Sequence, residues 1–235
     1  GGDNLSQRVC TASGAVLNPI NLAIGSIQGF NGSVNLSYQG FPAGFSGGFS
    51  ANPVTAPGAS IANVTADASV ATGNYNFGIR GTSGAIERNL SVSVQAFDSV
   101  PGAIVLNGPA NGAGGQPLRP SFSWTGDAEA TGYTIEIATD AGFANIVVSQ
   151  AVAGTSFTPA SDLVPDTQYF WRVRGGNECG GGANSAVFGF STGLLYCAAP
   201  NLAIPDNATV ANTLNVAGTG TITDLNVLIK ANHTW

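Results

Sequence analysis

Enzyme chemistry at neutral pH often depends on histidine, and this sequence has a single one, His233, two residues before its end. Any Ser–His–Asp or Cys–His arrangement would have to use that residue. A zinc site built from several histidines is excluded by the count. Two acidic pairs, Asp127 with Glu129 and Asp162 with Asp166, have the side chains that acid–base catalysis needs. Both pairs lie in turn-rich segments, where aspartates typically stabilise turns, so the sequence favours a chain without catalytic residues.

The composition points to an extracellular β protein. Of the 235 residues, 43% are hydrophobic and 9% are charged, whereas an average domain has about 25% charged residues. With a net charge of −6 and a mean hydropathy of +0.19, charge-driven disorder is not expected. Seven scattered basic residues argue against nucleic-acid binding. No apolar run reaches the roughly 20 residues of a membrane span, and because the chain starts Gly-Gly-Asp, we expect a precursor segment to have been removed.

Short segments of alternating apolar and polar residues, separated by clusters of Gly, Pro, Asn and Ser, predict strands and turns. Ser, Thr and Asn fill the outward positions in which Lys and Glu are more usual. A triple glycine at 180–182 lacks the flanking Lys-Ser/Thr of a phosphate loop and is better explained by a β-hairpin. The clearest strand segments are Ser33–Tyr38, Tyr75–Arg80, Leu90–Val94, Tyr133–Ala138, Ile146–Gln150 and Tyr169–Arg174.

Two linker-like segments divide the chain. Asp98–Ala103 contains a Pro-Gly turn signal, and Gly193–Pro200 follows an expected strand. The resulting pieces are residues 1–98, 99–193 and 194–235. Pieces of about 100 residues are the size of β-sandwiches, whereas the third piece is too short to hold such a core alone.

The middle piece resembles fibronectin type III domains. The run Leu-Val-Pro-Asp-Thr-Gln-Tyr at 163–169 is similar to the E–F corner of that family. The resemblance implies that the Tyr169 ring is buried and that its hydroxyl binds nearby backbone. Trp124 then corresponds to the core tryptophan of strand B, and Trp171 lies in the strand after the corner. These aromatics favour core packing over ligand stacking.

The two flanking pieces carry further resemblances. The motifs at 30–37, 49–55 and 73–82 are similar to bacterial immunoglobulin-like modules found downstream of secreted enzymes. The motifs at 200–207, 218–227 and 233–235 resemble the opening of a P domain, the β-sandwich that follows the catalytic domain of proprotein convertases. Only the first third of such a domain would be present, so we expect this chain to be a fragment of a longer protein.

The fold expected is therefore all-β: tandem immunoglobulin-like and fibronectin type III sandwiches plus a partial C-terminal β segment. This order resembles the tail of secreted bacterial peptidases, metallo- or subtilisin-like. The resemblance implies a secreted, non-catalytic accessory region that spaces, stabilises or targets the catalytic domain of the same polypeptide. The alternative is a cell-surface adhesion or carbohydrate-binding array, with an extracellular protein or polysaccharide as partner. That alternative needs an exposed row of coplanar aromatic rings.

Three cysteines, Cys10, Cys179 and Cys197, leave one without a partner inside the chain. On the fibronectin-like resemblance, Cys179 lies in the F–G loop and Cys197 just after the last strand of the domain. We expect a Cys179–Cys197 disulfide, with the linker folded back along the domain. Two free thiols, or pairing of Cys197 within a complete P domain, are the alternatives. Cys10 would pair with a segment upstream or act as a small buried hydrophobe.

Calcium is the one cofactor worth testing. Asp206 and Asp224 lie at P-domain positions near turns, and Asp140 lies in a loop-like Thr-Asp-Ala-Gly stretch. Carboxylate oxygens suit Ca²⁺, but no run has the spacing of a calcium loop. Turn capping is the competing interpretation for all three aspartates. No other cofactor is expected.

Overall fold

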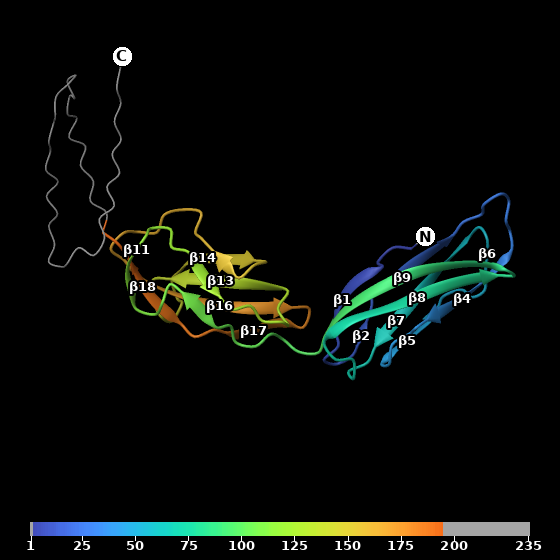
Figure 1. The fold of residues 1–235 in the computed structure, drawn as a ribbon, viewed down its shortest axis with the longest axis horizontal. Helices are drawn as coiled ribbons and strands as arrows, with labels where there is room; N and C mark the ends of the chain where they lie inside the picture. Colours follow the sequence, from blue (N-terminus) through green and yellow to red (C-terminus); the bar gives the residue numbers. More distant parts are fainter. Residues whose placement is uncertain (1, 195–235) are drawn as a thin grey trace, which may run out of the picture. The chain divides into compact units, whose positions relative to one another are not determined.

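A computed structural model describes residues 2–194, and in them the chain is all β, with strands β1 to β18 (Figure 1). No helix in this part has the length and hydrophobicity to cross a membrane. The compact unit that contains both sandwiches ends at Gly193. The motifs expected for a P-like segment, at 200–207, 218–227 and 233–235, lie outside the described residues.

The first sandwich has two sheets. One has the strand order β1-β9-β8-β4-β6, and in it β1 runs parallel to β9. In the other, β7 is central: β2 and β3 pair along one edge, and β5 pairs along the opposite edge. The strands are β1 (Ser6–Cys10), β2 (Ala15–Val16), β3 (Ile20–Ile24), β4 (Ser33–Gln39), β5 (Phe45–Phe49), β6 (Val54–Thr55), β7 (Gly58–Ala66), β8 (Gly73–Ser83) and β9 (Ile86–Phe97).

Strict alternation along the long strands builds the core of this sandwich. In β7, Ala62 and Val64 are fully buried, whereas Asn63 and Thr65 between them are exposed. In β9 the inward positions are Val92, Val94 and Ala96. Because successive side chains point to opposite faces of a sheet, this pattern gives each sheet one apolar face, and the two faces pack together.

The second sandwich also consists of two sheets, which enclose a core of their own. Its small sheet has the order β10-β12-β15, and its large sheet the order β11-β18-β16-β13-β14, with β17 paired to β16. Here β11 runs parallel to the last strand, β18, as β1 does to β9. The strands are β10 (Leu106–Gly108), β11 (Ala113–Gln116), β12 (Phe122–Trp124), β13 (Gly132–Ala138), β14 (Ile146–Val152), β15 (Ser156–Phe157), β16 (Gln168–Asn177), β17 (Gly180–Asn184) and β18 (Phe188–Thr192).

Aromatic side chains fill the core of the second sandwich. Trp124, Tyr169 and Trp171, which the sequence places in the core, are 2%, 2% and 0% exposed. The Phe122 ring meets the edge of Trp171 at 5.0 Å, and Tyr169 stacks on Phe190 at 5.6 Å. The Tyr169 hydroxyl accepts a hydrogen bond from the Val164 amide at 3.0 Å. This is the corner arrangement of immunoglobulin-like sandwiches, so the all-β, tandem-sandwich fold is as the sequence predicts.

Tyr169→Phe tests the corner. The change keeps the ring but leaves the Val164 N–H without its acceptor, which costs about 1–2 kcal/mol. We expect a loss of that size in the free energy of unfolding of the second sandwich, measured by urea denaturation. The matched control is Tyr75→Phe, because the Tyr75 hydroxyl donates to the Ala71 carbonyl at 2.9 Å in an exposed position of the first sandwich. Equal losses in the two variants would contradict a special role for the corner.

Candidate functional site: the junction of the two sandwiches

The acidic pairs that the sequence singles out serve as turn and surface groups. The Asp127 carboxylate accepts from the Glu129 amide at 2.8 Å, which closes a tight turn. Asp162 pairs with Arg119 at 2.6 Å on an exposed surface, and Asp166 adopts a left-handed backbone (φ 50°) before β16. Within residues 2–194, no group of three or more His, Cys, Asp or Glu side chains could hold a metal ion. His233 lies outside the described residues.

Asp140 is a turn-capping residue. Its Oδ1 accepts from the Ala144 amide at 3.1 Å and its Oδ2 from the Asn145 amide at 2.7 Å. These backbone donors, the Ala144 amide first, lower the pKa of the carboxyl group below its ordinary value. Both oxygens are therefore already engaged by the loop. The other two calcium candidates, Asp206 and Asp224, lie outside the described residues.

The capping role of Asp140 predicts a pH dependence. Because its pKa is lower in the folded protein, the carboxylate stabilises the fold above the ordinary pKa near 3.8, and this contribution is lost as pH falls through the folded value. We expect Asp140→Asn to lower the thermal midpoint at pH 7 and the difference from the parent protein to shrink toward pH 2. The control is Asp162→Asn, which removes an exposed ion pair and should change the midpoint little. A constant difference across this pH range would refute the capping role.

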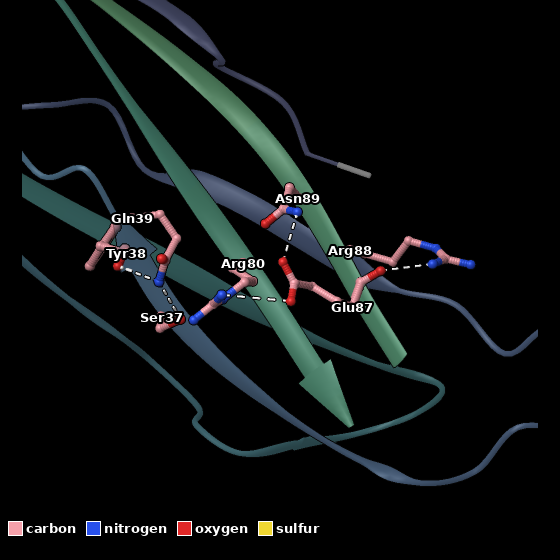
Figure 2. A network of polar contacts seen from close by, with 7 residues as sticks. All are labelled: Ser37, Tyr38, Gln39, Arg80, Glu87, Arg88 and Asn89. Carbon is pink, nitrogen blue, oxygen red and sulfur yellow. Dashed lines mark hydrogen bonds and ion pairs between the residues drawn. The ribbon is translucent and has the colours of Figure 1, made fainter. Parts of the chain in front are cut away.

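Figure 2 shows a polar cluster across β4, β8 and β9 of the first sandwich. Arg80 lies opposite Ser37 on one neighbouring strand and Asn89 on the other. Its Nη1 is 3.6 Å from Glu87 Oε2, and the other oxygen of Glu87 accepts from Asn89 at 3.1 Å. The guanidinium of Arg88 donates to the carbonyl oxygen of Glu87 at 2.7 Å. These are cross-strand contacts on a sheet surface, and the cluster contains a single carboxylate and no nucleophile with a base beside it.

A stacked aromatic cluster in the first sandwich was not expected from the sequence. The Tyr38 ring lies between Phe41 and Phe49, with centroids 4.3 and 4.6 Å away. The rings are partly buried against the first core, and the Tyr38 hydroxyl reaches the Asn63 carbonyl at 3.1 Å. Burial raises the pKa of Tyr38 to about 12. The exposed large hydrophobic side chains of residues 2–194 are aliphatic, and the rings of this cluster are partly buried.

The junction holds a disulfide between Cys10 and Cys179, 169 residues apart in sequence, with their Cα atoms 4.7 Å apart. Cys10 ends β1 and lies opposite Phe97, which ends β9. Cys179 lies in the two-residue turn between β16 and β17, and its sulfur is 3.2 Å from the Phe97 carbonyl oxygen. The bond therefore connects the end of the first sandwich to a hairpin turn of the second.

This pairing corrects the expected Cys179–Cys197 bond, because a sulfur atom forms only one disulfide. The sequence places Cys179 in the correct kind of loop, a hairpin turn. It then favours the partner that is nearest along the chain, whereas the fold brings β1 of the other sandwich to this turn. Cys10, expected to pair upstream or to be a buried hydrophobe, is the partner. Cys197 lies outside the described residues.

One side chain, Asn177, ties the disulfide turn to the linker. Its Nδ2 donates to the Ser99 carbonyl at 2.8 Å and to the Glu129 carbonyl at 3.0 Å. Its Oδ1 accepts from the Cys179 amide at 2.8 Å. The amide group is thus bonded to the linker, to a loop of the second sandwich and to the turn that carries the disulfide.

A second polar contact crosses the junction through Thr72. Its hydroxyl accepts from the Asp98 amide at 3.0 Å and lies 3.0 Å from the Asp98 carboxylate and 2.8 Å from the Glu129 carboxylate. One hydroxyl hydrogen serves these two acceptors. Thr72 belongs to the first sandwich and Glu129 to the second. The bonds to Thr72 lower the pKa of Asp98.

Glycines of the β16–β17 hairpin make room for the linker. Pro101 is buried, and a Cβ added at Gly175 would lie 3.0 Å from the Pro101 Cβ. A Cβ at Gly182 would collide with the Pro101 carbonyl oxygen. The triple glycine is thus part of the predicted β-hairpin, and its third residue lets the linker backbone pack closely.

Comparisons with known proteins find similar solved structures but no matching family. No family model matches the sequence, and no curated protein matches it. Similar solved structures include domains A168–A170 of titin, at 12% identity and a TM-score of 0.43 over 77% of this chain and 59% of that one. The FN1–FN3 domains of chicken CNTN1 match at 16% identity and a TM-score of 0.43 over 82% of this chain and 64% of that one.

A third similar structure, an Fn3-like protein from Clostridium thermocellum, is 15% identical with a TM-score of 0.31, over 41% of this chain and 95% of that one. The present chain thus spans less than two thirds of the first two structures. Its own strand orders and the Tyr169 corner define it as a tandem of immunoglobulin-like and fibronectin-like β-sandwiches.

The disulfide can be mapped directly. Digestion of the unreduced protein with chymotrypsin, which cuts after Phe188 and Phe190, separates Cys179 from Cys197. We expect mass spectrometry to find the Cys10 and Cys179 peptides linked, and Cys197→Ser to leave this linked species unchanged. The linked pair of peptides should be absent from the Cys10→Ser variant, which serves as the control. A linked pair that contains Cys179 and Cys197 in the parent protein would overturn the assignment.

Proposed function

We propose that this chain is a non-catalytic spacer of a secreted protein, in which the disulfide-linked sandwiches hold neighbouring parts of the polypeptide at a set separation. The observation that carries the proposal is the Cys10–Cys179 bond at the junction. Inter-domain contacts within a chain ordinarily permit domain motion. A covalent bond beside the linker, added to the hydrogen bonds of Asn177 and Thr72, restricts that motion.

Two features support a location outside the cell. Disulfides form and persist in oxidising compartments and are rare in the cytosol. Exposed positions of β7 carry neutral polar side chains such as Asn63 and Thr65, and only 9% of the whole chain is charged.

We further propose that the neighbouring part is the catalytic domain of a secreted bacterial peptidase, metallo- or subtilisin-like. The order of the three sequence resemblances supports this proposal. The coding sequence upstream of Gly1 tests it: a domain with His-Glu-x-x-His or a Ser/His/Asp set is expected. A surface-anchored array of further sandwiches in that position would instead support the adhesion alternative.

The spacer role predicts a narrow distribution of distances between the two sandwiches. Dyes on keto-bearing residues at Ile86 and Ile146, both exposed, report that distance by single-molecule energy transfer. We expect a narrow distribution in Cys197→Ser and a broader one in Cys10→Ser/Cys179→Ser/Cys197→Ser, because the linker alone then joins the domains. Circular dichroism controls for intact folding of both variants. Equal widths in two folded variants would count against a spacer held by the disulfide.

A further inference from the structure

The Cys10–Cys179 bond creates a short covalent path through the described chain. From residue 2 the path follows β1 to Cys10, crosses the sulfur atoms, and continues from Cys179 through β17 and β18 to residue 194. Strands β2 to β16 lie in the loop that the disulfide closes. Both hydrophobic cores are built mainly from residues of that loop.

Tension along a polymer passes through the covalent connection between the two points of attachment. A closed side loop, joined to that connection only at its two ends, carries no end-to-end tension. The segments that remain in the path are already extended strands: β1, β17 and β18. A strand rises about 3.3 Å per residue, close to the maximum of about 3.3–3.6 Å for a stretched chain, so pulling lengthens them little.

We infer that the chain is a tension-bearing link in which the disulfide removes strands β2 to β16, which form most of both sandwiches, from the covalent load path. Pulling on the two ends loads β1, the disulfide and the last two strands, while the residues between Cys10 and Cys179 keep their fold. This inference rests on the disulfide and its place in the chain, and it holds whichever domain adjoins the sandwiches.

The same topology tolerates cleavage. A backbone cut between Cys10 and Cys179 leaves the two ends of the chain covalently joined through the disulfide. Arg88, in the exposed end of the β8–β9 hairpin, is one such site. Trypsin-like enzymes cut after basic residues unless proline follows, as Pro120 follows Arg119. Most of the cleavable positions lie in the loop, namely Arg80, Arg88, Arg172 and Arg174, whereas Arg8 and Lys230 lie outside it. A single proteolytic cut within this loop therefore leaves the two ends of the chain covalently joined.

Force spectroscopy of the full chain tests the inference. Peptide tags at the two ends attach the protein to beads, and Cys197→Ser is compared with Cys10→Ser/Cys179→Ser/Cys197→Ser. The residues beyond 194 contribute equally to both. We expect full extension of the variant without the disulfide to exceed that of Cys197→Ser by about 550–600 Å, the contour of the closed loop. Equal extensions would overturn the load path.

Reducing the disulfide of an already folded molecule avoids the risk that a cysteine variant does not fold. Dithiothreitol added to a single Cys197→Ser molecule under tension converts Cys10 and Cys179 to thiols while the reagent closes to its cyclic disulfide. We expect each molecule to lengthen by the same 550–600 Å or so after this step. Lengthening by that amount before reductant is added would refute the inference, as would no lengthening after it.

A cleavage assay gives a second, independent measurement. A specific protease site is inserted between Gly84 and Ala85, in the exposed turn of the β8–β9 hairpin, where insertions are well tolerated. After cutting, denaturing gels should show one band for Cys197→Ser without reductant and two bands with it. The same insertion in the variant without Cys10 and Cys179 should give two bands in both conditions. Two bands from unreduced Cys197→Ser would contradict the covalent path.

Discussion

Burial of one face of the central strands is the interaction on which both sandwiches depend. Alternate residues are buried in the second halves of β7 and β9, and the residues between them, such as Asn63, Thr65 and Ser93, carry neutral polar groups. Ion pairs contribute little to the stability of the fold compared with this burial. Among residues 2–194 the Arg80–Glu87 and Arg119–Asp162 pairs are largely exposed, and such pairs contribute about 0–1 kcal/mol each. Only Arg172, paired with Glu136 at 2.7 Å and set over the Phe143 ring at 4.0 Å, is more enclosed.

The junction follows from this burial. Strands β1 and β9 run parallel and share the same core, so they end together at Cys10 and Phe97. The linker starts directly after Phe97, which places Cys10 beside the start of the next domain. In the second sandwich the hairpin β16–β17 turns at Cys179, and its glycines accept Pro101 of the linker. Two independent cores thus bring two cysteines to one place, and the bond between them gives the pair its proposed spacer and load-bearing roles.

Strand positions and core aromatics could be predicted from the sequence because both depend on local pattern. The expected segment Tyr133–Ala138 lies within β13, and Tyr169–Arg174 within β16. Trp171 is fully buried. The stacking of Tyr38 between Phe41 and Phe49 could not be predicted in this way. These residues come from a strand, a loop and another strand of opposite sheets, and only the packing of the sheets sets their distance.

By itself, then, the sequence determined an all-β chain with sandwich strands, a fibronectin-like corner at Tyr169 and a hairpin turn at Cys179. Only the tertiary structure decided the partner of that cysteine. A period of two residues specifies which side chains enter a core, because each strand has two faces. It carries no information on which ends of two separate cores meet. The contact between Cys10 and Cys179 depends on the docking of a linker and a turn across 169 residues, and the choice of Cys197 as partner failed for that reason.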